Sequence, residues 1–228
     1  MEFWSNFVKT INRTFIVDNR WTMFTKGIGS TLFISFFAVL LGLVLGSLAA
    51  AGKMSKFKPT RWLANMYIDV IRGTPTMVQL LIIYYVIFAP IDINQYLVAI
   101  MGFGLNSGAY VAEIIRGGIL SISAGQTEAG RSLGLTSLQT MRYIVAPQAF
   151  KNIMPAMNNE FIVLIKETAM IGYVAKVDLT AAAMNVQSRT YDYIGPLLSI
   201  AVIYYVIIKI LTIFLNKLEK HLRKSDAR

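Results

Sequence analysis

The sequence contains no cysteine and a single histidine, His221, among its 228 residues. Disulfide bonds, thiolate metal sites and metal sites built from several histidines of this chain are therefore excluded. Charged residues are also scarce, at 15% against about a quarter in soluble domains. Hydrophobic residues make up 55% of the chain, and the mean hydropathy is +0.55. We therefore expect one domain, residues 1–228, that crosses a bilayer several times.

Acidic residues are outnumbered, with 12 Asp and Glu against 22 Lys and Arg, and the net charge is +10. In a soluble protein this excess would suggest a nucleic-acid partner. Here the basic residues gather at the ends of apolar runs, which is typical of a membrane protein, and no nucleic acid is expected. No nucleophile–base pair or metal set indicates an enzyme. The chain also lacks a GxxxxGK[ST] phosphate loop, so it needs no cofactor of its own and any ATP must be bound by another chain.

The apolar runs predict an all-α integral membrane protein with five spanning helices, each long enough for a hydrocarbon core of about 30 Å. The predicted spans are residues 27–52, 62–88, 95–120, 153–175 and 194–215. Gly42 and Gly46, four apart on the first of these, should allow a neighbouring helix to approach closely.

Positive charge predicts the orientation of these spans. The basic loop 53–61 and the basic tail 217–228 fall on one side of the membrane, together with the polar loop 121–151, and the positive-inside bias places all three in the cytoplasm. The N-terminal arm then lies outside, although it holds four basic residues: Lys9, Arg13, Arg20 and Lys26.

Polar residues interrupt the second predicted span in the phrase DVIRGTP, residues 69–75. Pro75 has no amide hydrogen, so the carbonyl of Ile71 loses its helical partner and the helix should kink or unwind. Broken helices at membrane depth commonly line a substrate site, because freed backbone groups need polar company. Arg72 could bind a substrate carboxylate, with Asp69 binding an amino group or orienting Arg72. Alternatively, these two residues form an ion pair that only locks helix packing.

Other polar residues fall within the third and fourth predicted spans. Glu160 precedes an apolar run, so its carboxylate could face the translocation path and bind an ammonium or guanidinium group; alternatively, it lies at the membrane interface. Ser107 belongs to a stretch of small residues that leaves room for a ligand or a close helix contact. Glu113 and Arg116 are three apart, which favours a structural ion pair within one helix.

The loop 121–151 predicts two short helices separated by a glycine. Residues 126–133 form the first, with Gly134 as its stop. Thr136 or Ser137 caps the second, which ends near Pro147. Such a rigid projection suits docking on a cytoplasmic partner, although an ordinary helical connector has the same pattern.

Four phrases, in order and spacing, resemble the polar-amino-acid permease family of ABC importers. They are YIDVIRGTPTMVQLLIIYY (67–85), GAYVAEIIRGGI (108–119), TEAGRSLGLTSLQTMRYIVAPQA (127–149) and NNEFIVLIKETA (158–169). The third resembles the EAA loop of that family, with Gly130 in place of the usual second alanine, a change expected to soften the first short helix. The likeness extends over about residues 25–215.

The resemblance implies a type I ABC importer permease fold in a bacterial cytoplasmic (plasma or inner) membrane, with the EAA loop and the C-terminus in the cytoplasm. It implies a permease for polar L-amino acids, including basic ones, that works by alternating access. It also implies a separate ATPase subunit that binds ATP and Mg²⁺, a second permease subunit in a homodimer, and an extracellular or periplasmic binding protein. The alternative from residues alone is a secondary amino-acid transporter driven by an ion gradient.

Motif position assigns residues to two sites. The substrate-binding residues implied are Asp69, Arg72, Thr74, Gln79, Ser107, Asn158, Asn159 and Glu160. Those implied in coupling to the ATPase are Glu128, Ala129, Ser132, Leu133 and Gly134.

Overall fold

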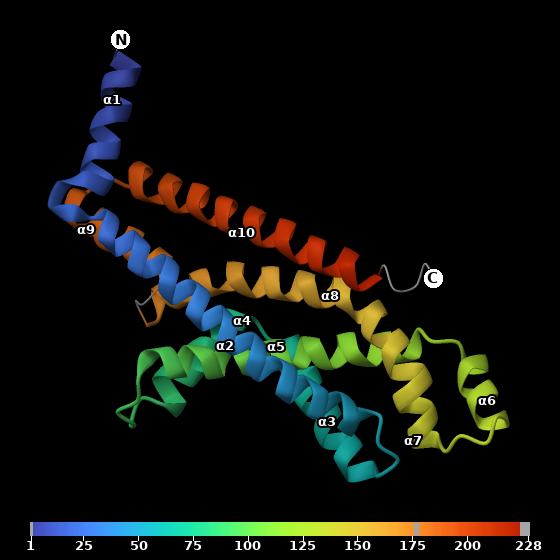
Figure 1. Ribbon diagram of the computed structural model, residues 1–228. Coiled ribbons are helices and arrows are strands. Elements are labelled where there is room, and N and C mark those ends of the chain that lie inside the picture. The colour runs from blue at the N-terminus through green and yellow to red at the C-terminus, as the bar shows by residue number, and fades with distance from the viewer. Residues whose placement is uncertain (1, 176–177, 224–228) are drawn as a thin grey trace.

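The computed structural model describes residues 2–175 and 178–223, and no strand occurs within these ranges. Ten α-helices follow one another along the described chain, with short π and 3₁₀ turns between some of them (Figure 1). They are α1 (Glu2–Ile11), α2 (Trp21–Lys53), α3 (Lys58–Gly73), α4 (Thr76–Ile82), α5 (Gln95–Leu120), α6 (Ala124–Ser132), α7 (Ser137–Thr140), α8 (Ala146–Glu167), α9 (Leu179–Thr190) and α10 (Ile194–Arg223). The all-α prediction is confirmed.

Helices α2 and α5 form the most extensive helix pair of the fold. Glycines on both helices make the approach possible: a Cβ built on Gly46 would lie 2.5 Å from Val111 Cγ1, and one on Gly108 would lie 3.0 Å from Leu45 Cβ. Lipid tails are as apolar as leucine, so helices in a membrane associate through close van der Waals packing rather than through burial from water. The small face predicted at Gly42 and Gly46 is therefore confirmed as a packing face.

The core lies where α2, α4, α5 and α8 meet. Ile34, Leu80, Phe103 and Leu164, one from each helix, are buried there together. On α2 the buried residues recur three or four positions apart, which places them on one stripe of the helix. The opposite stripe of α2 is exposed and apolar, as expected for a surface that faces lipid or another membrane helix.

The second predicted span is broken, as its proline indicates. The chain bends by 108° across Thr74 and Pro75, between α3 and the segment Thr76–Ile87, which consists of α4 and the π turn that follows it. Both residues are extended, with φ/ψ of −121°/148° and −63°/133°. Proline sterically disfavours a helical conformation in the preceding residue, so the local sequence ends α3 at Gly73. We refer to residues 74–75 as the break.

Three described helices are long and apolar enough to cross a membrane: α2, α5 and α10. The bent pair of α3 with α4 and the π turn that follows could form a fourth. The segment 153–175 is not among them, because α8 carries Lys151, Glu160, Lys166 and Glu167. The count of five spans, and the division of the single domain 1–228 into them, stays a prediction; residues 176–177 and 224–228 lie outside the described ranges.

The second short helix predicted in the loop does not end near Pro147, and this expectation is wrong. Helix α7 passes through a π turn at 141–145 directly into α8. The Ala146 amide donates to the carbonyl of Met141, five residues back. Proline in a regular helix clashes with the carbonyl four residues before it, whereas here it stands in the first turn of α8 after a wider turn. The chain therefore stays helical from residue 137 to Glu167.

Helix α9 connects α2 to α10 at the end of the fold that lies far from α6. Asp178 caps α9, with its Oδ1 accepting from the Ala181 amide at 2.9 Å and its Oδ2 from the Tyr204 hydroxyl at 3.2 Å. Burial raises the pKa of the Asp178 carboxyl, although these hydrogen bonds act in the opposite direction. One buried carboxylate thus joins α9 to α10.

Candidate functional site

Gln79 holds the break together. Its side-chain Nε2 donates to the Ile71 carbonyl at 2.7 Å, to the Thr74 carbonyl at 3.0 Å and to Thr74 Oγ1 at 2.7 Å. The Ile71 carbonyl is the group that Pro75 leaves without a helical partner, so the Gln79 amide replaces the missing backbone donor. Gln79 is itself buried, at one turn from the start of α4.

A chain of polar side chains runs from the break across α5 to α8. The Asn106 amide donates to Gln79 Oε1 at 2.9 Å, and the adjacent Ser107 hydroxyl donates to Glu160 Oε1 at 2.8 Å. We call these residues (Thr74, Gln79, Asn106, Ser107 and Glu160) the polar chain. Asn106 and Ser107 are almost fully buried on the middle of α5. Carboxylate, hydroxyl and amide groups thus lie together between α4, α5 and α8, where an unpaired buried polar group is costly.

Arg72 does not pair with Asp69, so the alternative in which these two residues form an ion pair is not the arrangement found. Its Nη1 lies 3.9 Å from Glu113 Oε2, and its guanidinium lies 5.4 Å from the centre of the Tyr110 ring. Asp69 is exposed on α3. The polar residues before the break therefore face two different directions, and only Arg72 turns toward α5.

Glu113 is the centre of an ion network that joins α2, α3 and α5. Lys53 Nζ donates to its Oε1 at 2.6 Å, and Arg116 donates to its Oε2 through Nη2 at 2.9 Å and Nε at 3.1 Å. The predicted pair of Glu113 with Arg116 is confirmed. One carboxylate within contact distance of three cations holds the ends of three helices in register. Sequence reasoning missed Lys53, because it lies 60 residues from Glu113.

Asn158 and Asn159, the two residues before Glu160, lie outside the polar chain. The Asn158 amide donates to Glu219 Oε2 at 3.2 Å and so connects α8 to α10. Asn159 is exposed on α8. The structure therefore brings together Thr74, Gln79, Ser107 and Glu160 of the expected substrate-binding set, and leaves Asp69, Arg72, Asn158 and Asn159 outside the polar chain. Asn106 is the member that sequence reasoning missed; an amide within an apolar run was the available signal.

The α6–α7 projection is built by two capping motifs. Gly134 has φ of +85°, its amide donates to Arg131 O at 3.0 Å, and the Leu135 amide donates to Gly130 O at 3.1 Å. These two bonds form the Schellman motif that ends α6. Thr136 then starts α7 through a capping box with Gln139. The predicted stop at Gly134 and the predicted cap at Thr136 are confirmed.

Gly130 is a contact between the two helices of the projection. A Cβ at this position would lie 2.8 Å from Ile144 Cδ1 and 2.9 Å from Thr140 Cγ2. The missing side chain lets α6 pack closely on the segment 140–144. Gly130 therefore permits close packing here, in addition to any lowering of helix propensity expected from the sequence.

The tip of the projection exposes large apolar side chains. Leu133 is 81% exposed and Leu138 is 77% exposed, and Tyr143 lies exposed nearby. The predicted coupling residues Glu128, Ala129 and Ser132 are exposed on the same helix. In Figure 1 this projection stands apart from the long helices, at the end opposite α1. An exposed apolar group on a short, rigid projection favours docking to another protein.

Comparison with known proteins matches residues 42–224 to a family described as "Binding-protein-dependent transport system inner membrane component". The chain belongs to this family. It is similar to the arginine transport system permease protein ArtQ of Bacillus subtilis (strain 168), with 39% identity over 203 residues, covering 88% of this chain and 93% of the relative. It is also similar to a putative glutamine transport system permease protein GlnP of Rickettsia typhi (strain ATCC VR-144 / Wilmington), with 42% identity over 83% of this chain and 88% of the relative.

A solved structure supports the same assignment. The crystal structure of an amino acid ABC transporter with histidines contains a chain with a TM-score of 0.84 and 43% identity to this one, covering 91% of this chain and 98% of that chain. The protein is therefore a membrane permease component of an ABC transport system. The resemblance carried by the four sequence phrases is confirmed.

Proposed function

We propose that this permease carries polar amino acids, basic ones included, along a path that passes the polar chain, and that a separate ATPase drives it through the α6–α7 projection. The observation that carries the proposal is the Glu160 carboxylate, held by Ser107 within an apolar bundle and joined through α5 to the broken helix. Relatives named for arginine and glutamine transport are 39% and 42% identical to this chain over 88% and 83% of its length, which supports the substrate class.

Different residues would bind the two ends of the substrate. Glu160 would bind the ammonium or guanidinium group of the substrate, replacing water by a charge-assisted hydrogen bond. Backbone N–H groups at the break would bind the carboxylate end, joined by the Thr74 hydroxyl once it releases the Val70 carbonyl, to which it donates at 2.8 Å. Gln79 would keep the break in shape. Arg72 would place a cation near the substrate carboxylate if it moves away from Glu113. Its contact with Glu113, at 3.9 Å, is the longest in the network. Asp69, Asn158 and Asn159 would enter the site only in another conformation.

Coupling would act through α6. An ATPase subunit would bind the exposed Leu133 and the neighbouring Glu128, Ala129 and Ser132. Its closure on ATP would shift α6, α7 and α8 together, because α7 continues into α8 through the π turn and α6 packs on the segment 140–144 at Gly130. The change of state requires that ATP-bound ATPase favour one permease conformation over the other. The projection and the C-terminal end of α10 would then lie in the cytoplasm, and the exposed apolar face of α10 would meet lipid or a second copy of the permease in a homodimer.

The test is uptake and ATPase activity in proteoliposomes that hold this chain with its ATPase subunit and binding protein. Glu160→Gln should weaken transport of a cationic amino acid about tenfold or more relative to a neutral one, since a hydrogen bond to a charged group contributes about 1.5–3 kcal/mol. Lys166→Gln, an exposed change on the same helix, is the matched control and should leave the ratio unchanged.

Two results would contradict the proposal. If Glu160→Gln reduced the transport of cationic and neutral amino acids equally, the Glu160 carboxylate would not be a group that binds the substrate cation. Uptake that follows an ion gradient and ignores ATP would instead support secondary transport.

A further inference from the structure

Helix α1 carries an apolar stripe along its exposed surface. Trp4, Phe7, Val8 and Ile11 recur at the i, i+3, i+4 and i+7 spacing of one helix face. They are 68%, 47%, 60% and 41% exposed, respectively. The rings of Trp4 and Phe7 meet edge to face at 6.0 Å, so the stripe is partly preformed. The opposite face of the helix presents Ser5, Asn6 and Lys9.

The direction of α1 is fixed at its base. The Arg13 guanidinium donates to the Thr190 carbonyl at the end of α9, and Arg20 Nη1 donates to the Arg13 carbonyl at 2.7 Å. Thr14 is buried against Gly195, where a Cβ would lie 2.6 Å from Thr14 Oγ1. The segment after α1 is therefore fastened to the corner between α9 and α10, and α1 leaves that corner in a set direction.

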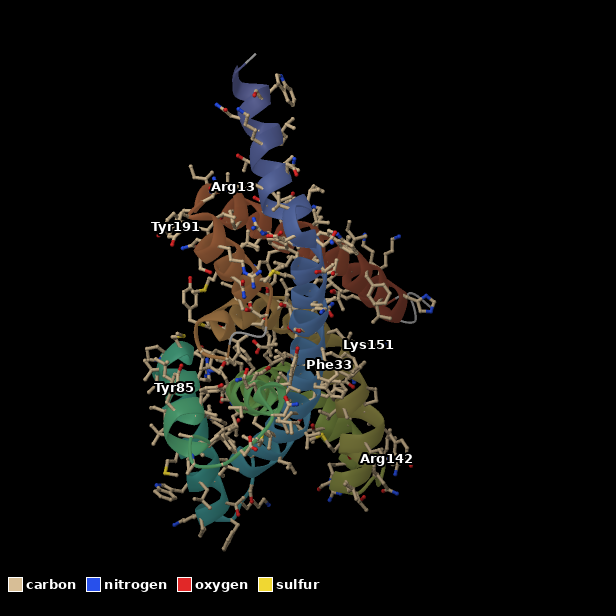
Figure 2. All side chains as sticks on the ribbon, turned by 90° about the vertical axis from the view of Figure 1, so that its left-hand side faces the viewer. Arg13, Phe33, Tyr85, Arg142, Lys151 and Tyr191 are labelled. Atoms are coloured by element: carbon tan, nitrogen blue, oxygen red, sulfur yellow. The ribbon has the colours of Figure 1, made fainter. Side chains whose placement is uncertain are left out.

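That direction lies across the long helices. In Figure 1, α1 runs crosswise to α5, α8 and α10 at the end opposite the α6–α7 projection. In Figure 2, which views the molecule from that end, α1 extends away from the other helices, with the labelled Arg13 at its base. A helix that crosses the spanning direction at one end of the bundle lies in the plane of the membrane surface.

We propose that α1 is an interfacial anchor that binds the lipid surface on the side opposite the α6–α7 projection, with its apolar stripe at the boundary between headgroups and acyl chains. Helices of this kind combine a strongly apolar face with a polar face that carries basic residues. In α1, the basic residue on the polar face is Lys9. Tryptophan beside phenylalanine is suited to the headgroup level.

The proposal also accounts for three of the four basic residues of the N-terminal arm, Lys9, Arg13 and Arg20, which oppose the positive-inside bias. Arg13 and Arg20 bind within the fold: Arg13 binds the Thr190 carbonyl, and Arg20 binds Asp18 Oδ2 at 2.9 Å. Lys9 projects from the polar face of an interfacial helix. These charges therefore have local roles and need not determine which side the arm occupies.

The absence of cysteine from the chain makes the test direct. Single cysteines are introduced at positions 4, 7, 8 and 11 and at the polar positions 5, 6 and 9 of the full-length protein, and each carries a nitroxide label. The labelled proteins are reconstituted in vesicles of phosphatidylcholine and phosphatidylglycerol. Collision rates with oxygen, which concentrates in lipid, and with a water-soluble nickel chelate are measured for each. Ser132→Cys on the exposed surface of α6 serves as the aqueous control.

The expected result is a high ratio of oxygen to nickel collisions at 4, 7, 8 and 11 and a low ratio at 5, 6, 9 and the control, with a helical period of about 3.6 residues. A nickel collision rate at 4, 7, 8 and 11 equal to that of the control would place α1 in water and overturn the proposal. Protection of the stripe from both reagents would also overturn it, because the stripe would then be covered by protein, such as a second copy of this chain.

Discussion

Gly134 provides the sharpest test of how the α6–α7 projection is built. Its φ of +85° is strained for any residue with a Cβ, yet a Cβ at this position would meet nothing within 4 Å. Gly134→Ala therefore introduces a backbone cost without a steric clash, and a left-handed conformation costs an L-residue about 1–2 kcal/mol. Two bonds close the end of α6 here, from the Gly134 and Leu135 amides, and both should open more often.

The magnitude can be measured by hydrogen exchange on the reconstituted protein. A cost of about 1–2 kcal/mol raises the population of the opened end by a factor of about 5–30, so the amides of Leu133, Gly134 and Leu135 should exchange faster by that factor. In the same proteoliposomes, stimulation of the ATPase subunit by substrate should fall, because the docking surface at Leu133 is no longer held in place.

The matched control is Gly125→Ala in the same helix. Gly125 has an ordinary helical backbone, and its added Cβ would lie 3.5 Å from Ser123 Oγ, a normal contact. Alanine favours the helix over glycine by up to about 1 kcal/mol, so this variant should exchange no faster than the parent and keep its ATPase stimulation. If Gly134→Ala exchanged at the parent rate, the reasoning from φ would be refuted. If exchange rose while stimulation stayed intact, α6 would not be the coupling element.

Three further predictions concern the contacts between spans, each measured by thermal unfolding in detergent and by uptake. Glu113→Gln leaves three cations around an uncharged amide and should lower stability by about 1–3 kcal/mol. Arg72→Gln removes the 3.9 Å contact with Glu113 and the contact with the Tyr110 ring, both at an exposed side chain, and should cost about 1 kcal/mol or less. The reverse order would show that Glu113 is not the centre of the network. Gln79→Leu leaves the Ile71 and Thr74 carbonyls at the break without the Gln79 donor, and leaves the Asn106 amide only its long 3.5 Å bond to Thr76 Oγ1. It should cost about 1–3 kcal/mol with loss of uptake, and unchanged uptake would mean that the break holds its shape without this residue. Asn158→Ala removes one bond between α8 and α10 and should cost about 1 kcal/mol without changing the KM for uptake; a raised KM would return Asn158 to the substrate site.

Local sequence signals were sufficient for several features. Pro75 removes a donor and restricts its neighbour, so the end of α3 follows from two adjacent residues. Gly134 is recognisable because few other residues adopt its conformation, and Thr136 with Gln139 forms a cap within four positions. The pair of Glu113 and Arg116 is likewise one helical turn apart. In each case the deciding interaction lies within a few residues along the chain.

The local pattern misled where a longer context decided the outcome. Pro147 indicated a helix end, but a π turn before it lets the helix continue into α8. Asp69 and Arg72 are three residues apart, a spacing that permits an ion pair within one helix. Arg72 turns instead to Glu113, because α3 packs along α5, the helix that carries that carboxylate.

By itself, the sequence determined that the chain is a helical membrane protein, where its second predicted span breaks, how the α6–α7 projection is capped, and to which family it belongs. Those properties depend on apolar runs, proline and glycine geometry and contiguous motifs. Only the tertiary structure decided the members of the polar chain, the second and third partners of Glu113 (Lys53 and Arg72), and the direction of α1. Ser107 and Glu160 are 53 residues apart, and Arg13 and Thr190 are 177 apart. Such contacts depend on how helices cross one another, which no short stretch of sequence specifies.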